Sequence, residues 1–351
     1  NGIDPIDVID KYGADALRFA LATGNSPGND MRFSDEKIEA ARNFANKLWN
    51  ASRFVRMNLT IDEVTLPDKS ELCPEDKWIL HRYNSLVGAV GSALDRFELG
   101  IALSLLYDFI WDVFCDWYIE FSEARLSKKD TPENITAQRV LAYVLTGTLK
   151  LLHPFMPFIT EEIYLALPHG GDAESIMISE YPSQNDSLNF PAEAEDTERV
   201  IAAIKAIRAR RNEMNIPPSR KSKVYIATKY AASFGGHTTV FFERLASASG
   251  VEVAENFENR ITVENCVQII TDSATIYLPM SDLIDTERER ARLEAELNKL
   301  EDEIERIRVK LSNEGFLTKA PAAVVEGERA KLNRCLENLE GIMAALKNLN
   351  N

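Results

Sequence analysis

Five side chains that could contact a polyanion share one spacing in the segment 34–57. They are Arg42, Asn46, Trp49, Arg53 and Arg56, and steps of three, four and seven residues place them on one face of a helix. Guanidinium groups pair with phosphates, an amide can read the edge of a base, and an indole can stack on one. This face suits phosphate contact and base stacking, although a surface network of salt bridges with Trp49 half buried explains the pattern nearly as well.

Two further basic clusters follow later in the chain. The junction cluster contains Arg208 and Arg211, and the stripe Arg292, Lys299 and Arg306 repeats every seven residues, which puts its members on one outer face of a long helix. The formal net charge is −15, so the summed field of the protein repels a polyanion and only local patches can bind one. Ordinary solubilising charge, balanced by nearby acids, is the alternative explanation for both clusters.

Patterns typical of an active site are missing from the sequence. There is no glycine-rich phosphate loop, no metal-spaced cluster of His and Cys, and no nucleophile elbow. The four histidines stand far apart, and the adjacent carboxylates of Glu161 and Glu162 point about 100° apart on a helix, which does not aim them at one proton. We therefore assign no catalytic residue and no metal ligand, and expect the chain to be the recognition part of a larger enzyme.

The last part of the chain gives the clearest structural signal. Apolar residues recur at alternating steps of four and three over 293–311 and again over 325–346, with a break near Gly315 and Pro321. These are two heptad seams, so two helices should fold back on each other as an antiparallel coiled-coil hairpin. Each helix is expected to contain roughly 28 to 31 residues and to reach about 45 Å. The second seam is predicted to include Met343.

The preceding part of the chain is predicted to be mainly helical. The expected helices are 12–21 after a turn at Asp4-Pro5, 34–57 with Ser34 as its cap, 76–95, 99–125, 136–152, a further helix capped by Thr160, and 193–214. Aromatic residues between Trp111 and Phe121 indicate core. Period-two segments then predict strands near 224–227, 251–253, 261–263, 267–270 and 275–278, with a helix near 239–247, which together form a small α/β module.

Length and composition place the chain among globular proteins. Its 351 residues with 45% hydrophobic content suffice for two or three domains, and its longest apolar stretches are far shorter than a membrane span. The first residues form neither a basic start nor an apolar run, so no secretory signal is expected. Four scattered cysteines without a CxxC pair favour a reducing compartment, so we expect a cytoplasmic protein without a membrane partner.

Several segments resemble class I aminoacyl-tRNA synthetases just after their KMSKS signature. They are NGIDP at 1–5, YGADALRF at 12–19, RNFANKLWN at 42–50, DWYIE at 116–120 and LHPFMPFITEE at 152–162. Within that class the combination is similar to the valyl-tRNA synthetases, because the hairpin with Asn313, Phe316, the run 319–321 and the pair 324–325 resembles their C-terminal arm. The resemblance covers essentially the whole chain.

The resemblance implies a division of the chain and a function. It gives a stem-contact segment at 1–60, an anticodon-binding helical bundle at 61–190, a linking helix with a small α/β module at 191–282, and a coiled-coil tRNA-binding arm at 283–351. It also implies that tRNA(Val) is the partner, together with the upstream catalytic domain of the same enzyme, which is expected to be a monomer. ATP with Mg²⁺ would act only in the full-length enzyme, and this chain alone would bind no cofactor and would be inactive.

On that resemblance, Arg42, Asn46, Arg53 and Arg56 are the candidate anticodon-side contacts, with the junction and arm clusters as further tRNA contacts. Two alternatives stay open. One is the isoleucine or methionine relative, which shares the bundle and ends differently. The other is a non-catalytic helical scaffold whose hairpin pairs with protein, since antiparallel coiled coils are common partner surfaces.

Overall fold

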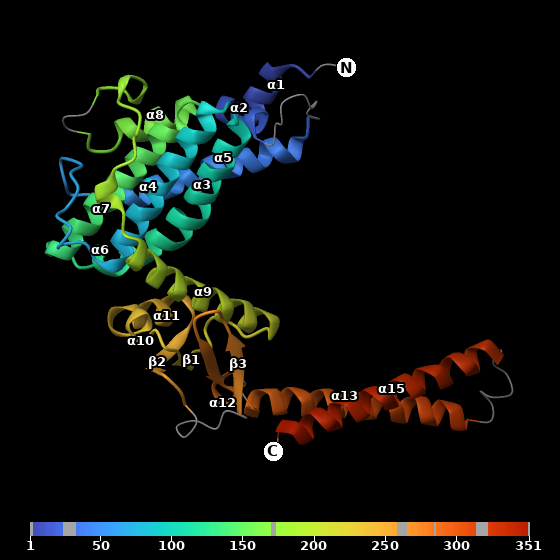
Figure 1. The fold of residues 1–351 in the computed structure, drawn as a ribbon. Coiled ribbons are helices and arrows are strands. Elements are labelled where there is room, and N and C mark those ends of the chain that lie inside the picture. The colour runs from blue at the N-terminus through green and yellow to red at the C-terminus, as the bar shows by residue number, and fades with distance from the viewer. Residues whose placement is uncertain are drawn as a thin grey trace. The chain divides into compact units, whose positions relative to one another are not determined.

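A computed structural model describes residues 3–23, 33–169, 173–257, 265–283, 286–313 and 322–349, and Figure 1 shows its ribbon. Within these ranges, the side chains of 286–292, 322–323 and 344–349 are not described. The chain forms two compact units, one up to Ile201 and one from Ala202 onward. Helices dominate, and the second unit holds a small sheet of four described strands. The predicted fold class, mainly α with a small α/β module and a helical hairpin, is confirmed.

The first unit is a helical assembly. Its elements are α1 (Pro5–Tyr12), α2 (Ala14–Ala22), α3 (Asp35–Asn58), α4 (Pro74–Asp95), α5 (Leu99–Asp108), the π-helix η1 (Phe109–Tyr118), α6 (Ile119–Leu126), α7 (Pro132–Leu152), α8 (Pro157–Leu165), the 3-10 turns η2 (Ile176–Ile178) and η3 (Asp186–Leu188), and the first half of α9 (Pro191–Glu213). The predicted helices at 34–57, 76–95, 136–152 and 193–214 correspond to α3, α4, α7 and α9. The predicted helix at 99–125 is continuous in direction but contains the wider π turn of η1 in its middle.

Aromatic side chains of this central helix form core, as their density indicated. Phe114, Trp117, Tyr118 and Phe121 are all at most 5% exposed. They pack edge-on or tilted against one another and against Trp78 of α4, with ring centroids 5.7 to 6.4 Å apart. Burial of several large rings supplies much of the apolar driving force for the bundle.

The start of the chain differs from the prediction. Asp4 and Pro5 were expected to form a turn, but Asp4 is the N-cap of α1 and its carboxylate accepts a hydrogen bond from the Ile6 amide at 2.8 Å. Pro5 at the first helical position suits this cap, because its missing N–H would have had no partner there. Gly13, with φ of 93°, then separates α1 from α2, so the predicted helix at 12–21 is the second of two.

The N-terminus of α8 is capped from a distance. Thr160 was expected to be its cap, but Thr160 is fully buried inside the helix and donates to the Met156 carbonyl at 2.8 Å. Asp15 of α2 takes the role instead, because its carboxylate accepts the amide N–H groups of Phe158 at 3.3 Å and Ile159 at 2.7 Å. A carboxylate at a helix N-terminus satisfies orphan donors and complements the helix dipole.

A buried charged cluster joins α4 to α6. Asp76 is fully buried, and its carboxylate accepts both guanidinium nitrogens of Arg125 at 2.6 and 2.7 Å and the Tyr118 hydroxyl at 2.6 Å. Burial opposes the charge of Arg125, but Asp76 outweighs it and raises the pKa of the guanidinium. Burial also raises the pKa of Cys73, whose thiol lies 3.0 Å from Asp76. The Arg125 guanidinium is therefore held in its charged form inside the bundle.

The second unit combines a sheet with the arm. Its elements are the rest of α9, β1 (Ser222–Ala227), α10 (Ala231–Phe234), the 3-10 turn η4 (Gly236–Thr238), α11 (Thr239–Leu245), β2 (Ala248–Ala254), β3 (Cys266–Ile270), β4 (Thr275–Pro279), α12 (Met280–Leu283), α13 (Thr286–Ser312) and α15 (Ala322–Leu349). The sheet order is β2-β1-β4-β3, with β1 parallel to β2 and the other pairs antiparallel. The predicted strand at 261–263 lies outside the described residues.

The arm is an antiparallel hairpin, as predicted. α13 and α15 contain 27 and 28 residues, and Lys310 pairs with Glu328 while Lys331 pairs with Glu303 at 2.7 Å, so the helices run in opposite directions. Ile304, Ile307 and Cys335 are buried in the seam. The break near Gly315 and Pro321 and the motif residues Phe316 and 319–321 lie outside the described residues.

One predicted seam residue is wrong. Met343 is 56% exposed, whereas Cys335 is buried and Ile342 contacts the groove between the helices. The seam of α15 therefore passes through Leu332, Cys335, Leu339 and Ile342, with steps of three and four.

We predict that Asp76→Asn destabilises the first unit by about 3–5 kcal/mol, because it leaves the Arg125 charge buried without its counter-ion. Urea unfolding followed by tryptophan fluorescence measures this unit alone, since Trp49, Trp78, Trp111 and Trp117 all precede Ile201. Glu98→Gln is the matched control. It removes an ion pair between Arg96 and Glu98, whose side chains are 59% and 37% exposed, and should leave the urea midpoint almost unchanged. Equal losses for the two variants would contradict the role of Asp76.

Candidate nucleic-acid interface

The predicted basic face exists on α3. Arg42, Asn46, Arg53 and Arg56 are all exposed, while Phe44, Leu48 and Val55 on the opposite side of the helix are at most 1% exposed. Trp49 is 41% exposed and lies on the same outward side. The helix is held by its apolar stripe, so the polar face is presented to solvent along the last four turns of α3.

The cations of this face are not neutralised within the described structure. Several other arginines of the first unit have carboxylates or carbonyls as partners. Arg18 donates to the Pro154 and Phe155 carbonyls, and Arg82 pairs with Glu198 at 2.7 Å. Among the described residues, no hydrogen bond or ion pair engages the guanidinium groups of Arg42, Arg53 or Arg56. The surface salt-bridge network that could have explained their spacing is therefore not seen in the described part of the chain.

An aromatic and charged edge lies beside this face, and the sequence pattern did not reveal it. Lys47 of α3 places its ammonium 3.9 Å above the Trp111 ring of η1 and 2.7 Å from the Asp116 carboxylate. Trp111 in turn stacks on Tyr107, with centroids 5.5 Å apart and planes 12° apart. Such stacked rings capped by a cation form a platform of the type that binds nucleic-acid bases. Only the contact of α3 with η1 brings these residues together, so spacing along one helix could not find them.

The structure corrects the junction cluster. Arg211 is 5% exposed, and its guanidinium donates to the Ser222 hydroxyl at 3.3 Å and to the carbonyls of Pro217, at 3.2 Å, and Arg220. Burial lowers its pKa. Arg211 holds the turn after α9 and offers no surface to a phosphate. Arg208 is exposed but donates to the Leu245 carbonyl, so part of its hydrogen-bonding capacity is already used.

The arm stripe is exposed but mixed with acids. Lys299 and Arg306 are exposed on α13, whereas the Arg292 side chain lies outside those described. Lys299 lines a groove between the two helices together with Glu296, Glu303 and Glu337. The stripe therefore carries less net positive charge than its spacing alone suggests.

Residues considered for catalysis have structural contacts. Glu161 accepts the Ser175 hydroxyl at 3.1 Å and the Ile176 amide at 3.2 Å. His153 lies 2.7 Å from the Thr160 hydroxyl, and burial lowers its pKa against the opposing charges of Glu161 and Asp15. Among the described residues, no three His, Cys, Asp or Glu side chains are grouped to hold a metal ion, and none of the described helices could cross a membrane.

Comparisons with known proteins match both units. The family model of the anticodon-binding domain of tRNA ligase matches residues 76–226, and that of the valyl tRNA synthetase tRNA binding arm matches residues 285–350. The valine-tRNA ligase of Clostridium acetobutylicum is 48% identical over 355 residues, which covers 99% of this chain and 40% of that protein. The valine-tRNA ligase of Bacillus subtilis is 44% identical over 336 residues, covering 94% of this chain and 37% of that protein.

The chain thus spans about two fifths of the length of the curated relatives it matches, over their C-terminal part. These relatives are named for valine, so the isoleucine alternative is not supported.

We predict that Arg211→Met lowers the thermal midpoint of the second unit, because three oxygen acceptors in the turn after α9 lose their donor. The free energy of unfolding should fall by about 1–3 kcal/mol. The thermal midpoint is measured by the far-ultraviolet circular dichroism of the whole chain. Arg208→Met, on the same helix but exposed, is the control and should change the midpoint far less. A large effect of Arg208→Met and none of Arg211→Met would contradict this assignment.

Proposed function

Because the chain belongs to the valine-tRNA ligase family, matching the C-terminal part of its members, we propose that it binds tRNA(Val) for the catalytic part of such an enzyme. In this proposal the first unit reads the anticodon, and the arm supports the outer corner of the L-shaped RNA. In this proposal the stem-contact segment at 1–60, the bundle at 61–190, the linking module at 191–282 and the arm at 283–351 each contribute contacts to the RNA.

The observation that carries the proposal is the set of unneutralised cations on α3. Arg42, Arg53 and Arg56 remain without a protein counter-ion in the described structure of a chain with net charge −15. A phosphate backbone supplies the missing negative charge, and Asn46 between the cations can donate to or accept from a base edge.

The edge formed by Lys47 and Trp111 extends this surface. Single-stranded anticodon bases are unstacked and can be splayed out onto aromatic or guanidinium planes. Trp111 is stacked on Tyr107 and covered by the Lys47 ammonium, so it offers such a plane when Lys47 leaves the ring and Asp116 for a phosphate. We assign phosphate contact to the arginines and base stacking to Trp111 and Trp49.

We further propose that Lys299 and Arg306, together with Arg292, contact phosphates of the tRNA corner, and that Arg208 adds a contact near the junction. The arm contacts are the weaker part of this assignment, since glutamates flank Lys299. In the full-length enzyme, ATP and Mg²⁺ would activate valine in the upstream part, and none of the residues described here is assigned to either. We place the enzyme in the cytoplasm, as a monomer.

The first test is salt-dependent binding of this chain to a valine tRNA transcript, compared with the same transcript carrying a changed central anticodon base. We predict that the single change weakens binding about tenfold or more, since one wrong base contact typically costs that much. Equal affinity for both transcripts would contradict anticodon reading. Failure to bind either transcript would favour a protein-binding scaffold, whose association with a protein partner would survive high salt.

Charge reversal separates phosphate contact from base reading. We predict that Arg53→Glu and Arg56→Glu each weaken both transcripts to the same extent and reduce the slope of log affinity against log salt by about 0.7 to 0.9. Lys299→Glu and Arg306→Glu apply the same measurement to the arm. Arg96→Glu is the control, because Arg96 is an exposed cation of the first unit that already pairs with Glu98. A slope that stays constant in the α3 variants would remove this face from the interface.

A further inference from the structure

A cluster of exposed apolar side chains lies on α8 and the 3-10 turn η2. Phe158 and Leu165 are 65% and 50% exposed and stand seven residues apart, so they share one side of α8. Met177 and Ile178 of η2 are 74% and 66% exposed. We call these four residues the α8–η2 face. Apolar side chains that gather in this way on a soluble protein mark an interaction surface, whereas single exposed ones are normal.

Hydrogen bonds hold η2 beside α8, so the four side chains belong to one surface. The Glu161 carboxylate of α8 accepts the Ser175 hydroxyl at 3.1 Å and the Ile176 amide at 3.2 Å. The Tyr164 hydroxyl donates to the Ala173 carbonyl at 2.6 Å. Ile176 points inward and is 4% exposed, which leaves the next two residues of η2 outside.

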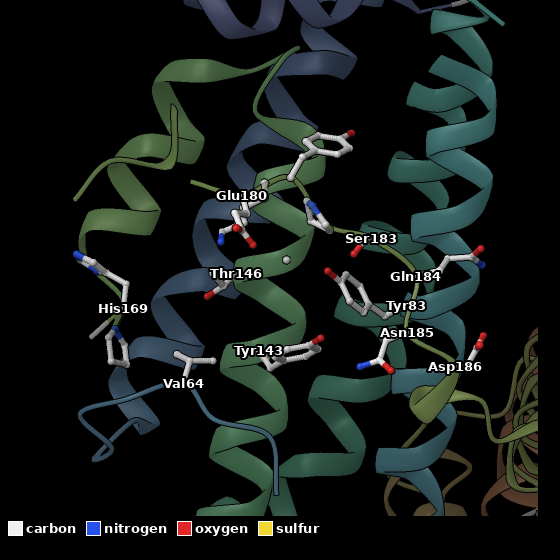
Figure 2. Close-up of a pocket in the computed structure, with 15 residues that line it drawn as sticks. Val64, Tyr83, Tyr143, Thr146, His169, Glu180, Ser183, Gln184, Asn185 and Asp186 are labelled. Atoms are coloured by element: carbon white, nitrogen blue, oxygen red, sulfur yellow. The ribbon is translucent and has the colours of Figure 1, made fainter. Parts of the chain in front are cut away.

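The segment that follows η2 is fastened to the bundle as well. Figure 2 shows Glu180 and the run 183–186 beside α7 and α4, where they line a cavity of about 630 Å³. The Asn185 amide donates to Asn84 Oδ1 of α4 at 2.8 Å. The backbone is therefore held on both sides of η2, and the α8–η2 face has a defined shape in the free chain.

The charges around this face disfavour RNA as its occupant. No lysine or arginine occurs in the sequence between Lys150 and Arg199. Glu162 of α8, Glu174 before η2 and Glu180 after it are all exposed. Such a border repels phosphates, so the partner that fits is a protein surface with an apolar centre and a cationic rim.

A second copy of the chain does not meet this requirement. Two copies related by a twofold axis place the same patch of each against the other, so the acidic borders would face each other. Like charges brought together across an interface cost free energy. The cationic rim therefore belongs to a different surface.

The beginning of the chain lies at the same end of the first unit. α2 contacts both α1 and α8, and its Asp15 and Arg18 bind backbone groups at and just before the start of α8. Figure 1 shows α1, α2 and α8 together at the end of this unit where the N-terminus lies. Ile3 and Ile6 are 54% and 60% exposed there. A preceding part of the polypeptide, tethered at this end, would meet the face at a high effective concentration.

We propose that the α8–η2 face is the docking surface for the part of the enzyme that precedes this chain. The proposal rests on the proposed function, since this chain matches 40% of its relative, over the C-terminal part. The upstream part presents apolar side chains to the face and lysine or arginine side chains to the three bordering glutamates. This contact fixes the first unit relative to the catalytic part.

Oxidation of methionines by hydrogen peroxide, located by mass spectrometry, tests the proposal. Met177, Met57 and Met343 are 74%, 78% and 56% exposed in this chain, so all three should react readily. In the full-length enzyme that contains this chain, Met177 should be oxidised about tenfold more slowly, because the upstream part covers it. Met57 on α3 and Met343 on the arm are internal controls and should keep their rates. Equal oxidation of Met177 in the two proteins would overturn the proposal.

Leu165→Glu combined with Ile178→Glu places two negative charges on the face. In the full-length enzyme this double variant should return Met177 to the oxidation rate of the free chain. In the free chain it should leave tryptophan-monitored urea unfolding unchanged, because both side chains are already exposed. Val309→Glu combined with Val324→Glu, at two exposed apolar positions of the arm, is the matched control and should leave Met177 protected. Protection that persists in the Leu165 and Ile178 variant would overturn the proposal.

The other occupants and the proposed function have separate readouts. Protection of Met177 in the free chain that rises with chain concentration, or that a valine tRNA transcript produces, would overturn the proposal in favour of a second copy or of RNA. Valine attachment to the transcript by the full-length enzyme reports on the proposed function. Free oxidation of Met177 in an enzyme that attaches valine would overturn the docking surface alone. Protected Met177 in an enzyme that attaches none would support the docking surface and contradict the proposed function.

Discussion

A carboxylate removed completely from water constrains the first unit. Asp76 lies at the start of α4, and among the described residues its hydrogen-bond partners are Arg125, Tyr118 and the Cys73 backbone and thiol. Desolvating a carboxylate costs several kcal/mol unless its partners have good geometry, so the path of the chain from α4 through η1 to α6 is set by the need to bring these donors to one point. Tyr118 is the last residue of η1, and the same π-helix carries Trp111, which lies beside Lys47 of α3. The candidate RNA surface therefore depends on a charge that the RNA itself would not touch.

A second polar constraint ties the beginning of the unit to its end. Asp15 caps α8, and Arg18, one turn further along α2, donates to the carbonyls of Pro154 and Phe155 just before that helix. Prolines at 154 and 157 remove two donors from this segment, so its carbonyls and the first amides of α8 need partners from elsewhere. Two of the motifs that carry the family resemblance, at 12–19 and 152–162, are thus the two halves of one clamp, and their likeness to the family reflects folding at least as much as RNA contact.

Periodicity predicted the elements that depend on local pattern and missed what depends on distant partners. The apolar stripe of α3 and the heptads of the arm are encoded within one helix, so the exposed face of α3 and the direction of the hairpin followed from spacing. Spacing could not predict that Asp15 caps α8, because the amides of Phe158 and Ile159 that it accepts lie more than 140 residues away. Arg208 and Arg211 look equivalent in sequence, yet only Arg211 is enclosed by the turn that follows α9. In the arm, Met343 and Ile342 are adjacent and equally apolar, and only the rotation of α15 decides which faces α13.

The distribution of charge on the protein affects how selective the proposed RNA binding is. With a net charge of −15, the protein does not attract RNA at long range, and at physiological salt its overall field is screened beyond about 8 Å. Acids pair with some of the other described cations, as in Arg82–Glu198 and Lys310–Glu328, whereas Arg42, Arg53 and Arg56 of α3 have no acid partner among the described residues. An RNA gains binding free energy from these arginines only when its phosphates are spaced to meet them. Shape and close contact therefore decide which RNA is held, and a surplus of general positive charge, which would hold every RNA, is avoided.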